Sequence, residues 1–330
     1  MFTVTGTGAY NQYFNIPDIK ASSFVVVDAL YSAKGSTWSP QAFWTDGQLH
    51  LRAAGTRTWQ VMILADGGDA FAAPGSYGIR ARNGNIKTQI DSVNKVLGIK
   101  YGGTFEFGMY WRPGMQAIIS DPYYFQFPTP ITTYERPMVF LNAENYMMVT
   151  GFYVSGGPGN WTGWGISHAS VYYRQHGLEV SDFMKMKWLL ASYKNDTPLV
   201  DQYGAVVRDA ANQRIFSTTD NLALLSAQPS SNAFWNDGEP IVVGSTYNYS
   251  SRVTWTGSFD DYVLANALFS QTNIEQTVDP IVINWGGFLP GNRSILKMYA
   301  QRTSSGGAPV DGLSANGRTL FASRPMKQLF

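Results

Sequence analysis

The sequence contains no cysteine among its 330 residues. This absence excludes disulfide bridges, thiolate metal sites and cysteine catalysis, and it is atypical of a small secreted domain stabilised by disulfides. Charged residues make up only 14% of the chain, against about 25% in a typical soluble domain. The net charge of +1 gives no electrostatic reason to expect binding to nucleic acid or to an anionic membrane surface.

Long apolar runs are missing as well. No stretch approaches the roughly 18 consecutive apolar residues that suggest a membrane-spanning helix, and residues 1–6 lack the basic start and apolar run of a secretory signal. We therefore expect a protein that is made in the cytoplasm and leaves it, if at all, by a route that needs no signal.

Aromatic residues, in contrast, are abundant at 15%, and glycine occurs 33 times. This composition favours strands and turns over helices, and the best short helix candidate is 260–269. Many Tyr and Trp residues with few charges are typical of protein–protein contacts. We expect an all-β fold of tandem antiparallel β-sandwich modules with short hairpins and Gly/Pro-rich loops.

One segment of the sequence recurs. Residues 77–92 return as 203–218 at a constant offset of 126 (203 − 77 = 126), and a shorter third copy occupies 312–324. Each copy reads as a glycine, an alternating strand, a turn bearing Asn or Asp, and a second strand that ends in a small polar residue, which predicts a β-hairpin. Each is preceded by a strand and a polar loop, so duplication is the preferred interpretation. Chance similarity within a β-rich chain is the alternative.

The repeat predicts the domain organisation. We place an N-terminal β module, an incomplete repeat, at 1–76, and β-sandwich repeats at 77–202 and 203–330. Two proline-led strands, at 137–141 and 280–284, support the duplication. The C-terminal hairpin at 311–330 has no body behind it, so it either closes the preceding repeat or extends to a neighbouring subunit.

Residues suited to catalysis are few. Three histidines occur without the spacing of a zinc motif, namely His50, His168 and His176. Two pairs of carboxylates are candidates for glycoside cleavage, namely Asp66 with Asp69 and Asp260 with Asp261. The first pair lies in a Gly-rich loop, where turn formation is the preferred explanation. We expect no enzyme activity, no catalytic residue, no cofactor and no metal site.

The most unusual stretch is the Gly/Trp-rich segment 156–165. Its two tryptophans, Trp161 and Trp164, together with Tyr172, are candidate contacts for a partner protein or a glycan. The alternative is that both indole rings fold back over the end of a sandwich.

The three repeated segments, Gly78 to Ser92, Gly204 to Thr218 and Gly312 to Ser323, resemble those of minor tail proteins of long-tailed bacteriophages, of the tail-tip or baseplate class. The proline-led strand Pro137 to Phe140 and the stretch Gly151 to Arg174 are also similar to that family. The second and third copies end in Ser-Thr and Ala-Ser where the family pattern has Asp-Ser, and residues 1–57 match no pattern.

The resemblance implies a structural component of the tail tip or baseplate, located in the virion after assembly in the host cytoplasm. The second interpretation is a receptor-binding protein of the same tail that recognises a surface glycan or protein, and the third is an enzyme acting on the bacterial envelope. The partners of a structural tail component would be other tail proteins and copies of itself. A trimer is favoured because tail tips are built around a rotation axis. Leu320, Phe321 and Phe330 are the candidate assembly tail.

Overall fold

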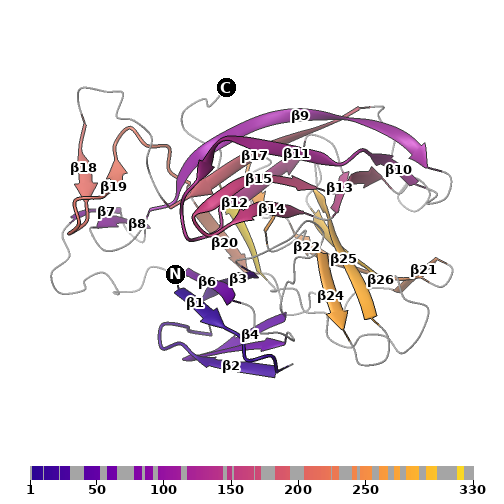
Figure 1. Ribbon diagram of the computed structural model, residues 1–330, viewed down its shortest axis with the longest axis horizontal. Coiled ribbons are helices and arrows are strands. Elements are labelled where there is room, and N and C mark those ends of the chain that lie inside the picture. The colour runs from indigo at the N-terminus through magenta and orange to yellow at the C-terminus, as the bar shows by residue number, and fades with distance from the viewer. Residues whose placement is uncertain are drawn as a thin grey trace.

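The described part of the chain consists of strands and turns in a computed structural model (Figure 1). The structure describes residues 2–9, 11–21, 23–29, 41–52, 58–64, 78–83, 86–91, 96–112, 117–143, 147–150, 152–166, 168–171, 183–193, 204–223, 225–229, 240–243, 246–254, 260–266, 271–275, 280–289, 295–302 and 318–322. Within these ranges there is no helix, and every strand pair is antiparallel, as in the pairing of β1 (Phe2–Thr5) with β6 (Thr58–Leu64). The predicted all-β class is confirmed.

The remaining strands follow in chain order. They are β2 (Asn11–Asn15), β3 (Phe24–Ala29), β4 (Gln41–Thr45), β5 (Gln48–Arg52), β7 (Gly78–Asn83), β8 (Ile86–Asp91), β9 (Gly98–Arg112), β10 (Ala117–Ser120), β11 (Tyr123–Ile131), β12 (Met138–Ala143), β13 (Met147–Thr150), β14 (Tyr153–Gly157), β15 (Asn160–Ile166), β16 (His168–Val171), β17 (Phe183–Ser192), β18 (Val206–Arg208), β19 (Arg214–Ser217), β20 (Leu225–Pro229), β21 (Pro240–Val243), β22 (Thr246–Thr254), β23 (Tyr262–Leu264), β24 (Gln271–Glu275), β25 (Pro280–Leu289), β26 (Ile295–Arg302) and β27 (Arg318–Ala322).

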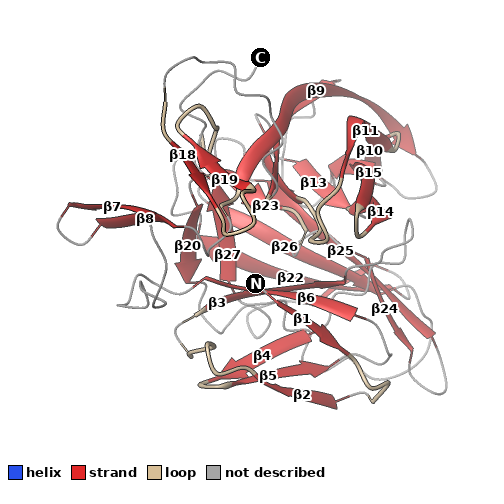
Figure 2. Ribbon diagram, turned by 60° about the vertical axis from the view of Figure 1, so that its left-hand side comes forward, coloured by secondary structure: helices blue, strands red, loops and turns tan. Residues whose placement is uncertain are grey.

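The first six strands form a small β-sandwich. One sheet has the order β1-β6-β3 and the other β2-β5-β4, and the side chains between them are buried because alternate residues of each strand point to the same face. The core of this sandwich consists of Ile16, Ile19, Val25, Val27, Leu49, Leu51, Trp59 and Val61. Both figures show the β2-β5-β4 sheet at the lower end of the molecule, beyond β1 and β6 (Figures 1 and 2).

The other face of β6 joins this sandwich to the body of the protein. Alternation along β6 turns Gln60 and Met62 away from Trp59 and Val61, and Met62 packs in a second core with Met138, Phe140, Leu189 and Leu264. The Gln60 Oε1 atom accepts a hydrogen bond from the backbone N–H of Arg136 at 2.8 Å. The Tyr193 hydroxyl group lies 3.2 Å from Met62 Sδ. The N-terminal sandwich is thus packed directly against β12 and β17.

Strand β12 lies at the centre of the body and is buried along its whole length. Met138 and Phe140 point to the core shared with β6, and Val139 and Leu141 point to a third core on the opposite face. The strand starts directly after Pro137, as the proline-led pattern predicts. Asn266 fixes this start, because its Oδ1 accepts from Val139 N at 2.8 Å and its Nδ2 donates to Pro137 O at 2.9 Å.

A three-stranded sheet, β11-β15-β14, covers the opposite face of β12, β17 and β9. The core between the two sheets is rich in aromatic rings. Phe105 and Tyr123 stack with their centroids 3.6 Å apart, Phe125 meets Trp188 at 4.6 Å, and Trp164 also contacts Trp188. Strands β1 to β17, with β23, therefore build four stacked sheet layers with three cores between them.

One sheet of fourteen strands crosses the predicted boundary between residues 202 and 203. Strand β12 pairs with β23, and β13 pairs with β25, so strands from both predicted repeats share this sheet. Strand β9 links its two halves, since it pairs with β17 along most of its length and with β10 at its end. The division into tandem sandwich modules stays a prediction.

Two of the three predicted hairpins lie in the described part of the chain, and the first strand of the third lies outside it. In the first, β7 pairs with β8 from Gly78 opposite Asp91 to Asn83 opposite Ile86. In the second, β18 pairs with β19, but Ser217, which the offset of 126 equates with Asp91 (91 + 126 = 217), lies opposite Val206. In the first hairpin Asp91 pairs with Gly78, whose equivalent in the second copy is position 204. In the second hairpin Ser217 pairs with Val206 instead, so the two hairpins differ in register by two residues.

The turn of the second hairpin explains the difference. Asp209 accepts hydrogen bonds at its Oδ1 from Ala211 N and Gln213 N, at 2.9 and 2.8 Å, and Asn212 adopts a left-handed backbone with φ of 60°. Asn tolerates this conformation better than most residues. This turn uses more residues than the two that separate Asn83 from Ile86, so fewer remain for pairing.

Two further expectations fall on the C-terminal half. The helix predicted at 260–269 is wrong, because Tyr262–Leu264 form β23 between β12 and β27. All three residues of β23 are buried. A short, continuous apolar run is typical of a strand that is covered on both faces, so its sequence need not show the spacing of an amphipathic helix. The duplication also predicts that Trp111 superposes on Trp235, but Trp235 lies outside the described residues.

Candidate functional site

The Gly/Trp-rich segment does not form a binding loop. It is a hairpin of β14 and β15, and the side chains of Trp161 and Trp164 are fully buried in the core beneath β11. Trp161 Nε1 donates to the buried backbone oxygen of Thr133 at 3.0 Å. The expectation that these two rings contact a partner or a glycan is therefore corrected, and the alternative, that they fold back over the sandwich, is what the structure shows.

A β-bulge explains how both rings point inward. Ser155 pairs with Gly163, but the next residue, Gly156, pairs with Trp161, so Thr162 is an extra residue on β15. The bulge shifts the alternation by one. With strict alternation, residues 161 and 164 would lie on opposite faces and one ring would be exposed.

The glycines of this hairpin make room for tyrosines on the outer face of the sheet. A Cβ atom at Gly165 would lie 2.6 Å from Tyr153 Oη and 2.5 Å from Tyr123 O, and one at Gly163 would overlap Tyr124 Oη. The Tyr124 and Tyr153 rings lie nearly parallel, with centroids 6.3 Å apart. Burial raises the pKa of Tyr153, and the neighbouring Tyr124 raises it further. The segment is thus built for packing on both faces.

The predicted assembly tail is partly described. Leu320 and Phe321 lie in β27, which pairs with β20 on one side and with β23 on the other. Strand β27 therefore pairs within its own chain, which agrees with the first alternative, that the C-terminal segment closes the preceding repeat. A role of its side chains in assembly stays a prediction. Phe330 and Tyr172 lie outside the described residues.

The predicted carboxylate pairs form no site in the described part of the chain. Asp66 and Asp69 lie outside it. Asp260 is exposed, and the backbone oxygen of Asp261 accepts a hydrogen bond from Asn142 Nδ2 at 2.8 Å, a contact that ties the loop before β23 to β12. Among the described residues no cluster of three or more His, Cys, Asp or Glu side chains is arranged to hold a metal ion.

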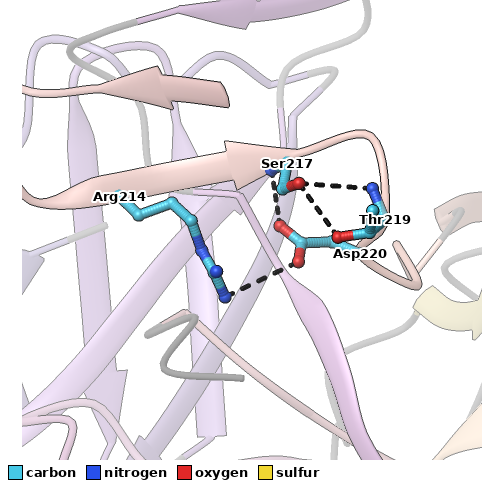
Figure 3. A network of polar contacts seen from close by, with 4 residues as sticks. All are labelled: Arg214, Ser217, Thr219 and Asp220. Atoms are coloured by element: carbon cyan, nitrogen blue, oxygen red, sulfur yellow. Dashed lines mark hydrogen bonds and ion pairs between the residues drawn. The ribbon is translucent and has the colours of Figure 1, made fainter. Parts of the chain in front are cut away.

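A buried polar network closes the second hairpin instead (Figure 3). Asp220 Oδ2 accepts from Ser217 N at 2.6 Å, and its Oδ1 lies 3.7 Å from Arg214 Nη2. Thr219 N donates to Ser217 Oγ at 3.3 Å. All these partners lie within seven residues of sequence, so the network holds the turn that follows β19, and it explains the small polar residue at the end of that strand.

The exposed face of the β2-β5-β4 sheet carries the candidate site. Tyr13 is 61% exposed, more than any other large hydrophobic side chain among the described residues. Its ring stacks on His50, which lies directly opposite on β5, with centroids 4.3 Å apart and an interplanar angle of 11°. His50 Nε2 is 3.2 Å from Asn11 Oδ1. We call Tyr13, His50 and Asn11 the Tyr13 platform.

The sequence-based reasoning missed this platform. The signal that was present is alternation along β2, where Asn11, Tyr13 and Asn15 are exposed and Gln12 is buried. Tyr13 thus lies between two amide side chains on the solvent-facing side of β2. Its partner, His50, comes 37 residues later (50 − 13 = 37), and only the pairing of β2 with β5 brings the two rings together.

Other exposed tyrosines are spread over the body. Tyr110 on β9, Tyr124 on β11 and Tyr134 after β11 are 44%, 45% and 51% exposed. The Tyr110 hydroxyl group donates to Asp121 Oδ1 at 3.1 Å. These rings lie on or beside strands of the sheets, so their positions are fixed before any partner binds.

No helix in the described ranges is long and apolar enough to cross a membrane. Comparison of the chain with protein-family models, with curated proteins and with solved structures finds no match.

Proposed function

We propose that the chain is a structural component of the tail tip or baseplate of a long-tailed bacteriophage, which assembles through protein–protein contacts. The observation that carries the proposal is the set of tyrosines exposed on rigid strands, Tyr13, Tyr110 and Tyr124, with Tyr134 beside them. Tyrosine is enriched in protein interfaces and loses little conformational entropy there. The low charge of the chain, at 14%, supports the same role.

The architecture supports this role in a second way. The N-terminal sandwich packs on the body through Met62 and Gln60, and the body packs on the β11-β15-β14 sheet through an aromatic core. Layers held together by continuous cores transmit load without hinges between them, as a tail component must. In this proposal the chain is not an enzyme, and it assembles with other tail proteins and with copies of itself, a trimer being favoured by the rotation axis of a tail.

The experiment is a loss-of-assembly test. Phage whose gene for this chain carries an early stop codon is grown with and without a plasmid that supplies the protein, and the particles are examined by electron microscopy. The proposal predicts free heads or incomplete tails without the plasmid and complete particles with it. Complete, tailed particles in the absence of the protein would contradict it.

Recognition of the host surface is the second candidate function, and the Tyr13 platform favours it. The platform lies on the sheet at the lower end of the molecule, beyond β1 and β6, in both views (Figures 1 and 2). A receptor-binding surface needs such a position, because the rest of the chain is occupied by its neighbours in the tail. The test is adsorption to host cells of complete particles that carry Tyr13→Ala. Unchanged adsorption would contradict this second candidate.

A further inference from the structure

The Tyr13 ring presents one open face. The imidazole ring of His50 covers the other face at 4.3 Å, nearly parallel. The 61% exposure of Tyr13 therefore belongs to the ring face and edge that point away from His50. His50 is itself oriented by the contact of its Nε2 with Asn11 Oδ1 at 3.2 Å. The aromatic surface is thus supported from behind before a ligand arrives.

Neutral hydrogen-bonding groups flank the open ring. Asn11 and Asn15 lie two residues before and after Tyr13 on the same exposed face of β2, at about 7 Å along the strand. On the adjacent strands, Gln48 of β5 lies opposite Asn15 and Thr45 of β4 lies opposite Gln48, and both side chains are exposed. Each amide offers two N–H donors and an acceptor oxygen.

This combination matches the chemistry of a sugar ring. One face of a pyranose exposes C–H bonds and is flat and apolar, and it packs against the negative face of an aromatic ring. The hydroxyl groups around its edge need partners that both donate and accept, which amide side chains provide. The register of the sheet also places Arg52 of β5 opposite Asn11. The ligand class therefore follows from the aromatic ring and the amide groups, whatever the charge of the sugar.

The position of β2 in the sheet leaves room for such a ligand. Strand β2 is an edge strand in the order β2-β5-β4, and the register Tyr13 opposite His50 places His50 on the inner side of the Tyr13 ring. The open ring face is therefore directed past the sheet edge. The opposite face of the same sheet, with Leu49 and Leu51, is buried in the sandwich core. A ligand at the platform displaces no core contact.

We propose that the Tyr13 platform is a carbohydrate-binding site for a hexopyranose unit of a surface polysaccharide. The sugar stacks on the open face of Tyr13 and forms hydrogen bonds with Asn11 and Asn15. This inference rests on the second candidate function, host-surface recognition, and it gives that function a ligand class and a site.

The experiment measures binding of the purified full-length chain to immobilised oligosaccharides of glucose, galactose, mannose, N-acetylglucosamine and glucuronic acid. We expect saturable binding to at least one of them. Tyr13→Ala should weaken it at least about tenfold, the scale of losing one ring stack, and Tyr13→Phe should bind like the wild type because it keeps the ring. Tyr134→Ala is the matched control, as another exposed tyrosine outside the platform, and should leave binding unchanged.

Two results would overturn the site. One is that no oligosaccharide of this set binds saturably, and the other is that Tyr13→Ala binds as tightly as the wild type. A short aromatic peptide that displaces every bound sugar at lower concentration would replace the ligand class with a protein. Failure of the sugar site can be distinguished from failure of host recognition. If particles with Tyr13→Ala adsorb poorly but the purified chain binds no sugar, Tyr13 recognises the host surface and the target is not a sugar.

Discussion

The indole rings of Trp164 and Trp188 meet edge to face, with their centroids 5.3 Å apart and an interplanar angle of 66°. Trp164 belongs to β15 and Trp188 to β17, so this contact joins two sheets at the middle of the aromatic core. Edge-to-face pairs add to the energy of burial itself. The contact turns the most unusual stretch of the sequence into the centre of a hydrophobic core.

Trp164→Ala should therefore lower the free energy of unfolding by about 3–5 kcal/mol, the usual cost of removing a large aromatic side chain from a core. The measurement is chemical denaturation followed by circular dichroism. Tyr134→Ala, at an exposed position, is the control and should change stability little. A Trp164→Ala variant as stable as the wild type would show that the ring is not part of the core.

Gly165→Ala tests the packing of the tyrosines over β15. The new methyl group would lie 2.6 Å from Tyr153 Oη and 2.5 Å from Tyr123 O, and the backbone oxygen cannot rotate away. We expect a loss of about 1–3 kcal/mol in the free energy of unfolding, typical of overpacking.

Gly108→Ala is the matched control for that variant. Gly108 is also in a strand, β9, but a Cβ atom there would meet nothing within 4 Å. The substitution should be neutral or slightly stabilising because alanine loses less backbone entropy than glycine on folding. Equal effects of the two substitutions would contradict the packing argument.

The contact between Tyr193 and Met62 predicts a pH dependence. Burial raises the pKa of Tyr193, and the nearby Glu135 raises it further. Because the folded-state pKa lies above the value of about 10 for an unfolded tyrosine, this residue contributes stability that is complete below pH 10 and is lost as the pH rises above it. Urea unfolding at pH 8 and at pH 11 measures the loss.

Tyr193→Phe should reduce the difference in unfolding free energy between pH 8 and pH 11, since phenylalanine cannot ionise. Tyr134→Phe, which changes an exposed tyrosine, should reproduce the wild-type difference. If Tyr193→Phe also behaves like the wild type, the hydroxyl group of Tyr193 is not held in the interface between the N-terminal sandwich and the body.

The sequence allowed the fold class and several local elements to be predicted. Composition indicated strands, Pro137 marked the start of β12, and the Asn-bearing turn after Gly78 indicated the β7-β8 hairpin. These features depend on residues close together in the chain. Repeated sequence did not predict repeated register, because the turn built around Asp209 and Asn212 consumes residues that the first hairpin uses for pairing.

Features that depend on distant pairing could not be predicted in the same way. The burial of both Trp161 and Trp164 requires a bulge at Thr162, which no periodicity signals. The Tyr13 platform requires β2 and β5 to pair in one register out of several, since a shift by one residue would turn Tyr13 into the core. A sheet that joins β12 to β23 likewise depends on contacts more than a hundred residues apart (263 − 141 = 122).

The central claim is that this chain is part of the tail end of a phage particle, and locating it there is the most direct test. An affinity tag inserted at 231–239, between β20 and β21, and labelled with gold allows the chain to be seen on purified particles by electron microscopy. The account predicts gold at the tip or baseplate, at the end of the tail distal to the head, in more than one copy per particle. Gold on the head or along the tail shaft, or purified particles that contain none of the chain by mass spectrometry, would contradict it.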